Sequence, residues 1–225
     1  MARGCVFGFS INSHQSTIIN PRESRMICKR FLMVLFLFFM MLVISGSSIA
    51  GEPTEDVRKT TDKLIAIISD PAMKSVDMAA ERARRIRKAV DERFDWKEMS
   101  KRTLARHWKK RTQLEKEEFI DLFGKLLERT YLDKVEGYSG EKVLYVGERV
   151  DGNYGIVVVK IVTKKDTEIL VKYKLKKKGG KWLVYDISIE GVSLVNNYRK
   201  QFNSIMTRSS YEDLIKKLRT KVEGE

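Results

Sequence analysis

Four consecutive runs of alternating apolar and polar residues constrain the fold more than any other feature of this chain. They cover residues 141–150, 153–163, 167–177 and 181–189. Only short segments separate the runs, and the turn residues Asp-Gly and Gly-Gly occur in two of these segments. Side chains of a strand repeat their direction every two residues, and connections this short join antiparallel neighbours. The sequence therefore predicts a four-stranded antiparallel meander.

The predicted sheet should have one face in water. Lys172, Lys174 and Lys176 alternate with apolar residues in the third run, as expected for a strand with one solvated side. The second run is apolar at successive positions from Ile156 to Val159, so we expect it to lie inside the sheet. The three lysines either steer the chain toward acidic partners or anionic bilayers, or only keep the sheet soluble.

Helical periodicity flanks the meander on both sides. Apolar residues recur every three or four positions over 57–68, 79–94, 113–131, 192–207 and 211–221. The predicted class is therefore α+β, with N-terminal helices, a four-stranded antiparallel meander and two C-terminal helices.

Two local signals set helix ends. Asp70-Pro71 should end the first helix, and Thr112 with Glu115 forms a capping box for the third. The second helix carries five cations between Arg82 and Lys88 on its polar face. We interpret them as a solvated face, with acidic lipid or a partner as the alternative.

The N-terminus resembles an export signal. Lys29 and Arg30 precede the apolar stretch 31–44, and Ser48-Ile49-Ala50 places small residues at the positions that signal peptidase reads. The stretch is shorter than the roughly 20 residues of a spanning helix. We expect cleavage after Ala50, with an uncleaved anchor as the alternative. The domain organisation is then an N-terminal extension and signal peptide (1–50) and a single domain (51–225).

The exported part is basic and poor in catalytic groups. Of 44 Lys and Arg and 30 Asp and Glu, five basic residues and one acidic residue precede Gly51, which leaves 39 against 29, or +10. Both cysteines also precede it, and His107 is the single histidine after it. Disulfides, cysteine catalysis and a Cys- or His-based metal site are thereby excluded. No nucleotide-binding motif is found, and export makes an anionic membrane a nearer partner than nucleic acid. The sequence favours a binding module over an enzyme, without metal or cofactor.

Several segments resemble the MlaC family, whose members are also known as toluene-tolerance proteins. Residues 182–202 read WLVYDISIEGVSLVNNYRKQF, close to the family pattern W-x-V-Y-D-V-x-I-E-G-V-S-L-V-x-N-Y-R-x-Q-F. Residues 94–99 and 119–131 resemble its F-D-F-x-x-M and F-x-x-x-F-x-x-L-L-x-x-T-Y patterns. Trp96 stands where the family has Phe, and Ala105 where its L-G-x-x-W pattern has Gly.

The resemblance implies a soluble periplasmic phospholipid carrier that maintains outer-membrane lipid asymmetry. It implies two partners: an outer-membrane lipoprotein–porin complex, and an inner-membrane ABC transporter with an MCE-domain subunit. Such a carrier would hold its cargo in an apolar cleft between sheet and helices. The alternative is an exported envelope module that binds protein or has a structural role, without a lipid cavity.

The candidate lipid-binding residues occupy apolar positions of the matching segments, with one cation added. They are Phe94, Met99, Trp108, Phe123, Leu127, Tyr131, Val157, Val159, Tyr173, Val184, Ile187, Val192, Val195, Tyr198, Arg199 and Phe202. Each apolar residue could instead fill the core. Arg199 could lie near the lipid phosphate at the mouth of the cleft, or form an ion pair with Asp186 or Glu190.

The export signal gives a direct prediction. Protein recovered from the periplasm of an expressing cell should have a mass and an N-terminal sequence that begin at Gly51. Replacing Ala50 with a bulky residue such as Phe should block cleavage, because signal peptidase accepts only small side chains there. A recovered chain that still contains residues 31–44 would support the uncleaved anchor.

Overall fold

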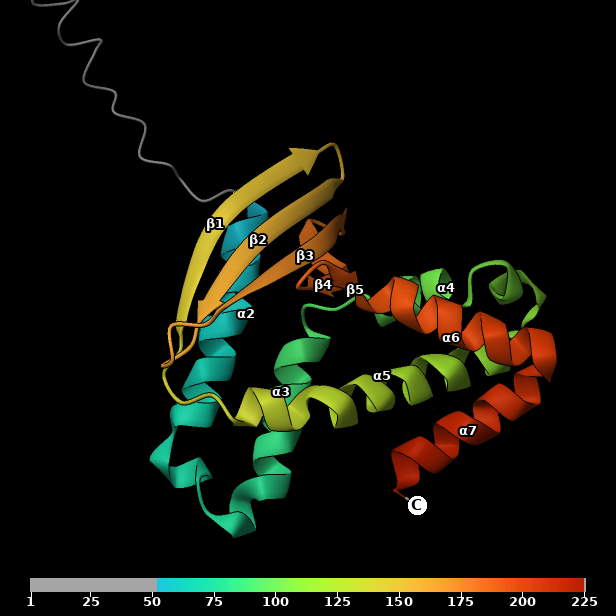
Figure 1. Cartoon of the computed structure of the whole chain (residues 1–225), viewed down its shortest axis with the longest axis horizontal. Helices are drawn as coiled ribbons and strands as arrows, with labels where there is room; N and C mark the ends of the chain where they lie inside the picture. The colour runs from blue at the N-terminus through green and yellow to red at the C-terminus, as the bar shows by residue number, and fades with distance from the viewer. Residues whose placement is uncertain (1–51, 225) are drawn as a thin grey trace, which may run out of the picture. The chain divides into compact units, whose positions relative to one another are not determined.

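The computed structural model describes residues 52–224 (Figure 1). The predictions for residues 1–50, including the export signal and its cleavage, lie outside these described residues. The α+β class is confirmed, because helices precede and follow one antiparallel sheet. Between residues 52 and 224, no helix has the length and apolarity that crossing a membrane would need.

Helices form the first part of the described chain. Their bounds are α2 Glu52–Ser69, α3 Ala79–Asp91, α4 Trp96–Leu104 and α5 Gln113–Glu136, with the 3₁₀ helices η1 Pro71–Met73, η2 Val76–Met78 and η3 Ala105–Lys110. As predicted, α2 ends before Asp70-Pro71, and the Asp70 carboxylate accepts a hydrogen bond from the backbone of Ala72 at 2.9 Å.

The capping box of α5 is confirmed. The Thr112 hydroxyl accepts from the backbone of Glu115 at 3.2 Å, and the Glu115 carboxylate accepts from the backbone of Thr112 at 2.6 Å. Two otherwise unpaired amide groups of the first turn are thereby satisfied. This fixes where the longest described helix begins.

The polar face of α3 is solvated in part, since Arg84, Arg85 and Lys88 are exposed, as predicted, whereas Arg82 and Arg87 are half-buried. Arg82 forms an ion pair with Glu136 at 3.0 Å, and Arg87 forms one with Glu128 at 2.6 Å. Both glutamates lie on α5, so these pairs join the two helices. These ion pairs depend on tertiary contact between the two helices, so the periodicity of α3 could not predict them.

The sheet has five strands in the order β1-β2-β3-β4-β5, not the four predicted. The strands are β1 Lys142–Asp151, β2 Tyr154–Val162, β3 Glu168–Lys178, β4 Lys181–Ile189 and β5 Val192–Ser193, and each pairs antiparallel with the next. The three predicted hairpins are therefore confirmed.

The fifth strand follows a tight turn. Its first residue, Val192, was predicted to begin a helix. Glu190 and Gly191 both have positive φ, 49° and 81°, as in the two-residue turns that suit antiparallel strands. Val192 and Ser193 then pair with β4, so helix α6 begins at Leu194 instead of Val192. The chain continues through α6 Leu194–Arg208 and α7 Tyr211–Glu223.

The two faces of the sheet have different surroundings. Helix α2 runs behind β1 and β2 (Figure 1) and packs against them and β4. On this inner face Val157 and Val159 are buried, and β2 is interior, as predicted. The opposite, outer face is less covered, since Ile156 and Val158 are only half-buried.

The segment before α4 pairs with β4 and so ties the helices to the sheet. The backbone N–H of Asp95 donates to the carbonyl of Val184 at 2.9 Å, and that of Val184 donates to Arg93 at 2.8 Å. Phe94 thus lies in register beside Val184. The buried Asp95 carboxylate also caps α4 by accepting from the backbone of Glu98 at 3.0 Å.

A buried carboxylate on β4 positions α6. Asp186 accepts hydrogen bonds from the Ser193 hydroxyl at 2.8 Å and from the backbone of Val195 at 3.1 Å. Ser193 in turn accepts from the backbone of Asn196 and so acts as the N-cap of α6. Lys174 completes the arrangement by donating to Asp186 at 3.1 Å. The negative charge lies at the N-terminus of the helix, where the helix dipole is favourable.

Asp186→Ala should lower the free energy of unfolding by about 2 to 3 kcal/mol, because a buried amide loses a charged acceptor. Lys174→Gln is the matched control and should cost less than about 1 kcal/mol, because the Lys174 side chain is partly exposed and Asp186 keeps its hydrogen bonds from Ser193 and Val195. Urea unfolding of both variants measures the difference. Equal losses would mean that the ion pair, and not the helix cap, is what Asp186 contributes.

Candidate functional site

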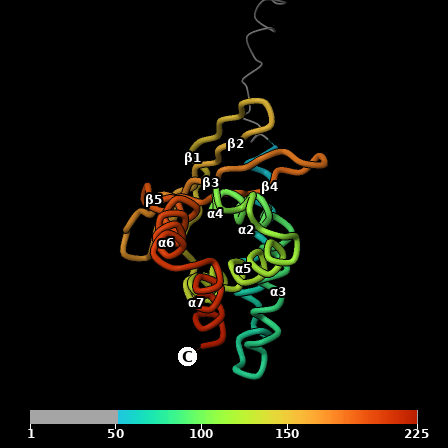
Figure 2. Tube along the Cα trace, turned by 90° about the vertical axis from the view of Figure 1, so that its right-hand side faces the viewer, coloured from blue at the N-terminus to red at the C-terminus, as the bar shows by residue number. Residues whose placement is uncertain are grey.

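The candidate residues are distributed over two apolar clusters. The sheet cluster consists of the buried residues Val57, Val157, Val159, Leu175, Trp182 and Val184. The helical cluster consists of Met99, Leu104, Trp108, Phe119, Leu122, Phe123, Leu126, Leu127, Val195, Phe202, Tyr211, Leu214, Ile215 and Leu218. Its helices lie together on one side of the strands (Figure 2).

The predicted residues divide into buried and partly accessible groups. The buried group contains Met99, Trp108, Phe123, Leu127, Val157, Val159, Val184, Val195 and Phe202. In this conformation these side chains contact protein on almost every side. Phe119, Phe123, Tyr198 and Phe202 pack with ring centroids 5.4–5.9 Å apart, a typical aromatic core.

The partly accessible group lies at the edges of both clusters. Phe94 packs against the sheet cluster and the helical cluster together, and so connects them. Tyr131 and Tyr198 pack against the helical cluster, while Tyr173 and Ile187 pack against the sheet cluster. These half-buried side chains are the predicted residues with surface available to a ligand.

Two of the tyrosines are in strongly apolar surroundings. Burial, together with Tyr145, raises the pKa of Tyr173 to about 12. Burial, together with Tyr198, raises the pKa of Tyr131. Tyr173 keeps some accessible surface despite this burial.

Tyr145 was not among the predicted residues. It shares the inner face of the sheet with Val159, and its buried hydroxyl has no hydrogen-bond partner among the described residues. The Arg58 guanidinium lies 4.1 Å from its ring centroid, and burial raises its pKa. Its alternation with Val143 in the first run was the signal that could have found it.

Val192 and Arg199 are placed differently from the other predicted residues. Val192 is 57% exposed on β5 and belongs to neither cluster. Arg199 is half-buried and donates to the backbone carbonyl of Arg102 at 2.7 Å. Among the described residues it forms no ion pair with Asp186 or Glu190, so that alternative was wrong.

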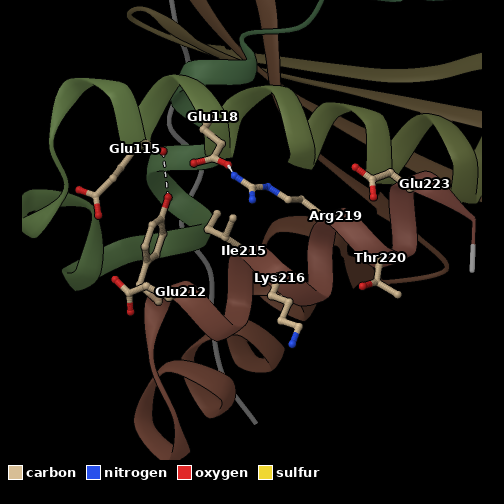
Figure 3. A pocket seen from close by; sticks show the side chains of 9 residues that line it. Glu115, Glu118, Glu212, Ile215, Lys216, Arg219, Thr220 and Glu223 are labelled. Atoms are coloured by element: carbon tan, nitrogen blue, oxygen red, sulfur yellow. Dashed lines mark hydrogen bonds and ion pairs between the residues drawn. The ribbon is translucent and has the colours of Figure 1, made fainter.

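Two surface pockets lie away from the predicted residues. One, of about 540 Å³, lies between α5 and α7 and is lined mainly by charged side chains, among them Glu115, Glu118 and Arg219 (Figure 3). The other, of about 400 Å³, lies between α2 and α3. Neither lies between the sheet and the helical cluster, so the apolar cleft remains a prediction.

Groups suited to catalysis or metal binding are few in the described part of the chain. His107 contacts the side-chain oxygen of Asn203 at 3.1 Å and no carboxylate. Residues 52–224 contain no group of three His, Cys, Asp or Glu side chains arranged to hold a metal ion.

The described residues form an α+β domain whose sheet cluster and helical cluster are joined at Phe94. The sequence profile described as MlaC protein matches residues 58–220. The chain therefore belongs to the MlaC family.

Two individual proteins agree with this assignment. The intermembrane phospholipid transport system binding protein MlaC of Haemophilus influenzae is 29% identical over 122 residues, 52% of this chain. The match spans 57% of that relative's length. A phospholipid-binding protein from Ralstonia solanacearum, solved in complex with a phospholipid, superposes with a TM-score of 0.70 at 22% identity. That superposition covers 77% of this chain and 98% of the other, and it shows the shared fold.

The burial of Tyr173 predicts a stability that depends on pH. Its folded pKa lies above the value of about 10 for an unfolded tyrosine, so the unfolded state loses its proton first. Stability from Tyr173 is complete below pH 10 and is lost as the pH rises through about 12, at up to about 1.4 kcal/mol per pH unit. Tyr173→Phe should flatten this fall in urea unfolding, whereas Tyr154→Phe at an exposed position should leave it unchanged. The same slope in all three proteins would contradict the burial of the hydroxyl.

Proposed function

We propose that this chain is a phospholipid-binding transport protein that holds a diacyl lipid between the sheet cluster and the helical cluster. The observation that carries the proposal is the set of half-buried aromatic side chains at the edges of both clusters, with Phe94 in contact with each. Membership of the MlaC family supports it, as do the phospholipid in the Ralstonia solanacearum structure and the name of the Haemophilus influenzae relative.

The physical need for such a carrier is large. Exposing a diacyl lipid to water uncovers roughly 30 methylene groups at about 0.8 kcal/mol each, or on the order of 20 kcal/mol. Unaided exchange between membranes is therefore very slow. A protein that replaces the bilayer interior needs apolar side chains and no catalytic groups, which agrees with the residues at the two clusters. We therefore propose binding and transport, and not catalysis.

The place of entry follows from the connection between the clusters. The inner face of the sheet and the aromatic core of α5 and α6 meet at Phe94. Acyl chains that enter beside Phe94 would separate side-chain contacts, while the strand pairing at Val184 stays intact. The half-buried Tyr131, Tyr173, Ile187 and Tyr198 would then line the chains.

The cellular role is part of the same proposal. The chain would work in the periplasm and move lipid between an outer-membrane lipoprotein–porin complex and an inner-membrane ABC transporter with an MCE-domain subunit, which maintains outer-membrane asymmetry. The alternative, an envelope module without a lipid cavity, is favoured by the complete burial of Met99, Phe123 and Val157, whose relative exposure is 0%.

The test is the lipid content of protein purified from the periplasm without detergent. Organic extraction and mass spectrometry should find close to one diacyl phospholipid per chain. Ile187→Trp should reduce this several-fold, because a larger ring fills space at the edge of the sheet cluster. Val76→Trp, at a position that is 90% exposed, is the matched control and should keep its lipid.

Thermal melting should be recorded for both variants, so that loss of lipid is not confused with loss of fold. Wild-type protein that lacks lipid and accepts none from vesicles would support the module without a cavity.

A further inference from the structure

The outer face of the sheet combines cations with uncovered apolar side chains. The strand register places Leu144, Lys160 and Leu170 in one row across β1, β2 and β3, and Val158 and Lys172 in the next row beside Gly147. These rows lie opposite the face that packs against α2.

The apolar part of this face is exposed where β1 forms the sheet edge. Leu144 is 45% exposed, and so is Tyr154 near the end of β2. Val146, at the irregularity in the pairing of β1, is 51% exposed. Ile156 and Val158 between them are half-buried. A soluble chain rarely keeps aliphatic side chains together in this way without a use for them.

The charges of the outer face are predominantly positive. Its cations are Lys142, Arg149, Lys160, Lys172, Lys174, Lys176 and Lys178, and its acids are Asp151, Glu168 and the buried Asp186. Lys160 pairs with Glu168 at 2.8 Å, Lys174 pairs with Asp186, and Lys178 pairs with Asp95 at 3.2 Å.

The remaining cations are free to meet a partner. Lys142, Arg149, Lys172 and Lys176 form no ion pair among the described residues, and Lys176 lies 5.7 Å from the ring centroid of Tyr154. By contrast, Arg82 and Arg87 on α3 have glutamate partners on α5.

We propose that the outer face of β1, β2 and β3 docks onto the surface of an anionic lipid bilayer. Long lysine side chains can place their ammonium groups among lipid phosphates while their stems cover apolar surface. Aliphatic side chains between them can enter the headgroup boundary, and Tyr154 has the aromatic body and polar tip typical of that depth. A bilayer adapts to this mixture, whereas a protein partner needs matched acidic groups at fixed positions. The inference goes beyond the proposed function, because a carrier could exchange lipid through membrane proteins without itself binding lipid surfaces.

The test is flotation of the protein with protein-free vesicles. Binding should be strong to vesicles with about one third phosphatidylglycerol, weak to pure phosphatidylcholine, and should fall between 50 and 300 mM salt as the Debye length shortens. Lys172→Gln/Lys176→Gln should weaken binding at 50 mM salt at least tenfold. The matched control, Lys109→Gln/Lys110→Gln on η3, removes the same charge from exposed positions elsewhere and should change it less than about twofold.

The apolar contribution is measured separately. Leu144→Ser should weaken binding about threefold without changing its salt dependence, because it removes no charge. If the two double-lysine variants lose the same amount of vesicle binding, the binding reflects net charge alone and the proposal is overturned. Binding that requires a membrane protein in the vesicles would also overturn it and assign the face to a protein partner.

The outcome is independent of the lipid cargo. Ile187 lies on the inner face, so Ile187→Trp should float with anionic vesicles as well as wild type does. A protein that carries lipid and fails to float would overturn the docking inference alone. A protein that floats and carries no lipid would overturn the proposed function alone.

Discussion

The pairing of Arg93, Phe94 and Asp95 with Val184 is the constraint on which the described structure depends. Two backbone hydrogen bonds hold the start of α4 against β4. Strand β5, which leads into α6, pairs with the same strand. Asp95 and Asp186 then fix the first turns of α4 and α6 with buried carboxylates. Because both helices are attached to one strand, the helical cluster has a defined position relative to the sheet. Phe94 packs against both the sheet cluster and the helical cluster.

The attachment at one strand also suits the proposed binding of a bulky apolar ligand. The sheet is held by strand pairing, and the helical cluster is held by its own aromatic packing. Backbone hydrogen bonds at Val184 tie the two parts together, and the side-chain contacts around Phe94 can rearrange without breaking these bonds. Interiors are close-packed, so a ligand of this size needs such a boundary between separately stable parts.

Charge is distributed differently over the two parts. In the helices, Arg82 and Arg87 are neutralised by glutamates one helix away, and Arg84 and Arg85 pair with Glu81. On the outer face of the sheet, β3 has lysine at alternating positions, and the basic side chains outnumber the acidic ones. The composition of the chain gives only its total excess of positive charge, and the ion pairs show where that excess is left uncompensated.

The sequence by itself determined what depends on local periodicity and local hydrogen bonding. The hairpins, the end of α2, the capping box of Thr112 and Glu115 and the N-cap at Ser193 were all predictable, because their partners lie within a few residues. The family patterns likewise pointed to Phe94, Tyr131, Ile187 and Tyr198, and the alternation of the third run pointed to Tyr173.

Tertiary structure alone decided which apolar residues keep accessible surface, since burial depends on neighbours distant in sequence. It also decided that Val192 turns into β5 and that Arg199 binds a carbonyl of α4. Tyr145 is a further example. Residues close to it in sequence do not determine its surroundings; the sheet register places it beside Val159, and Arg58 lies over its ring.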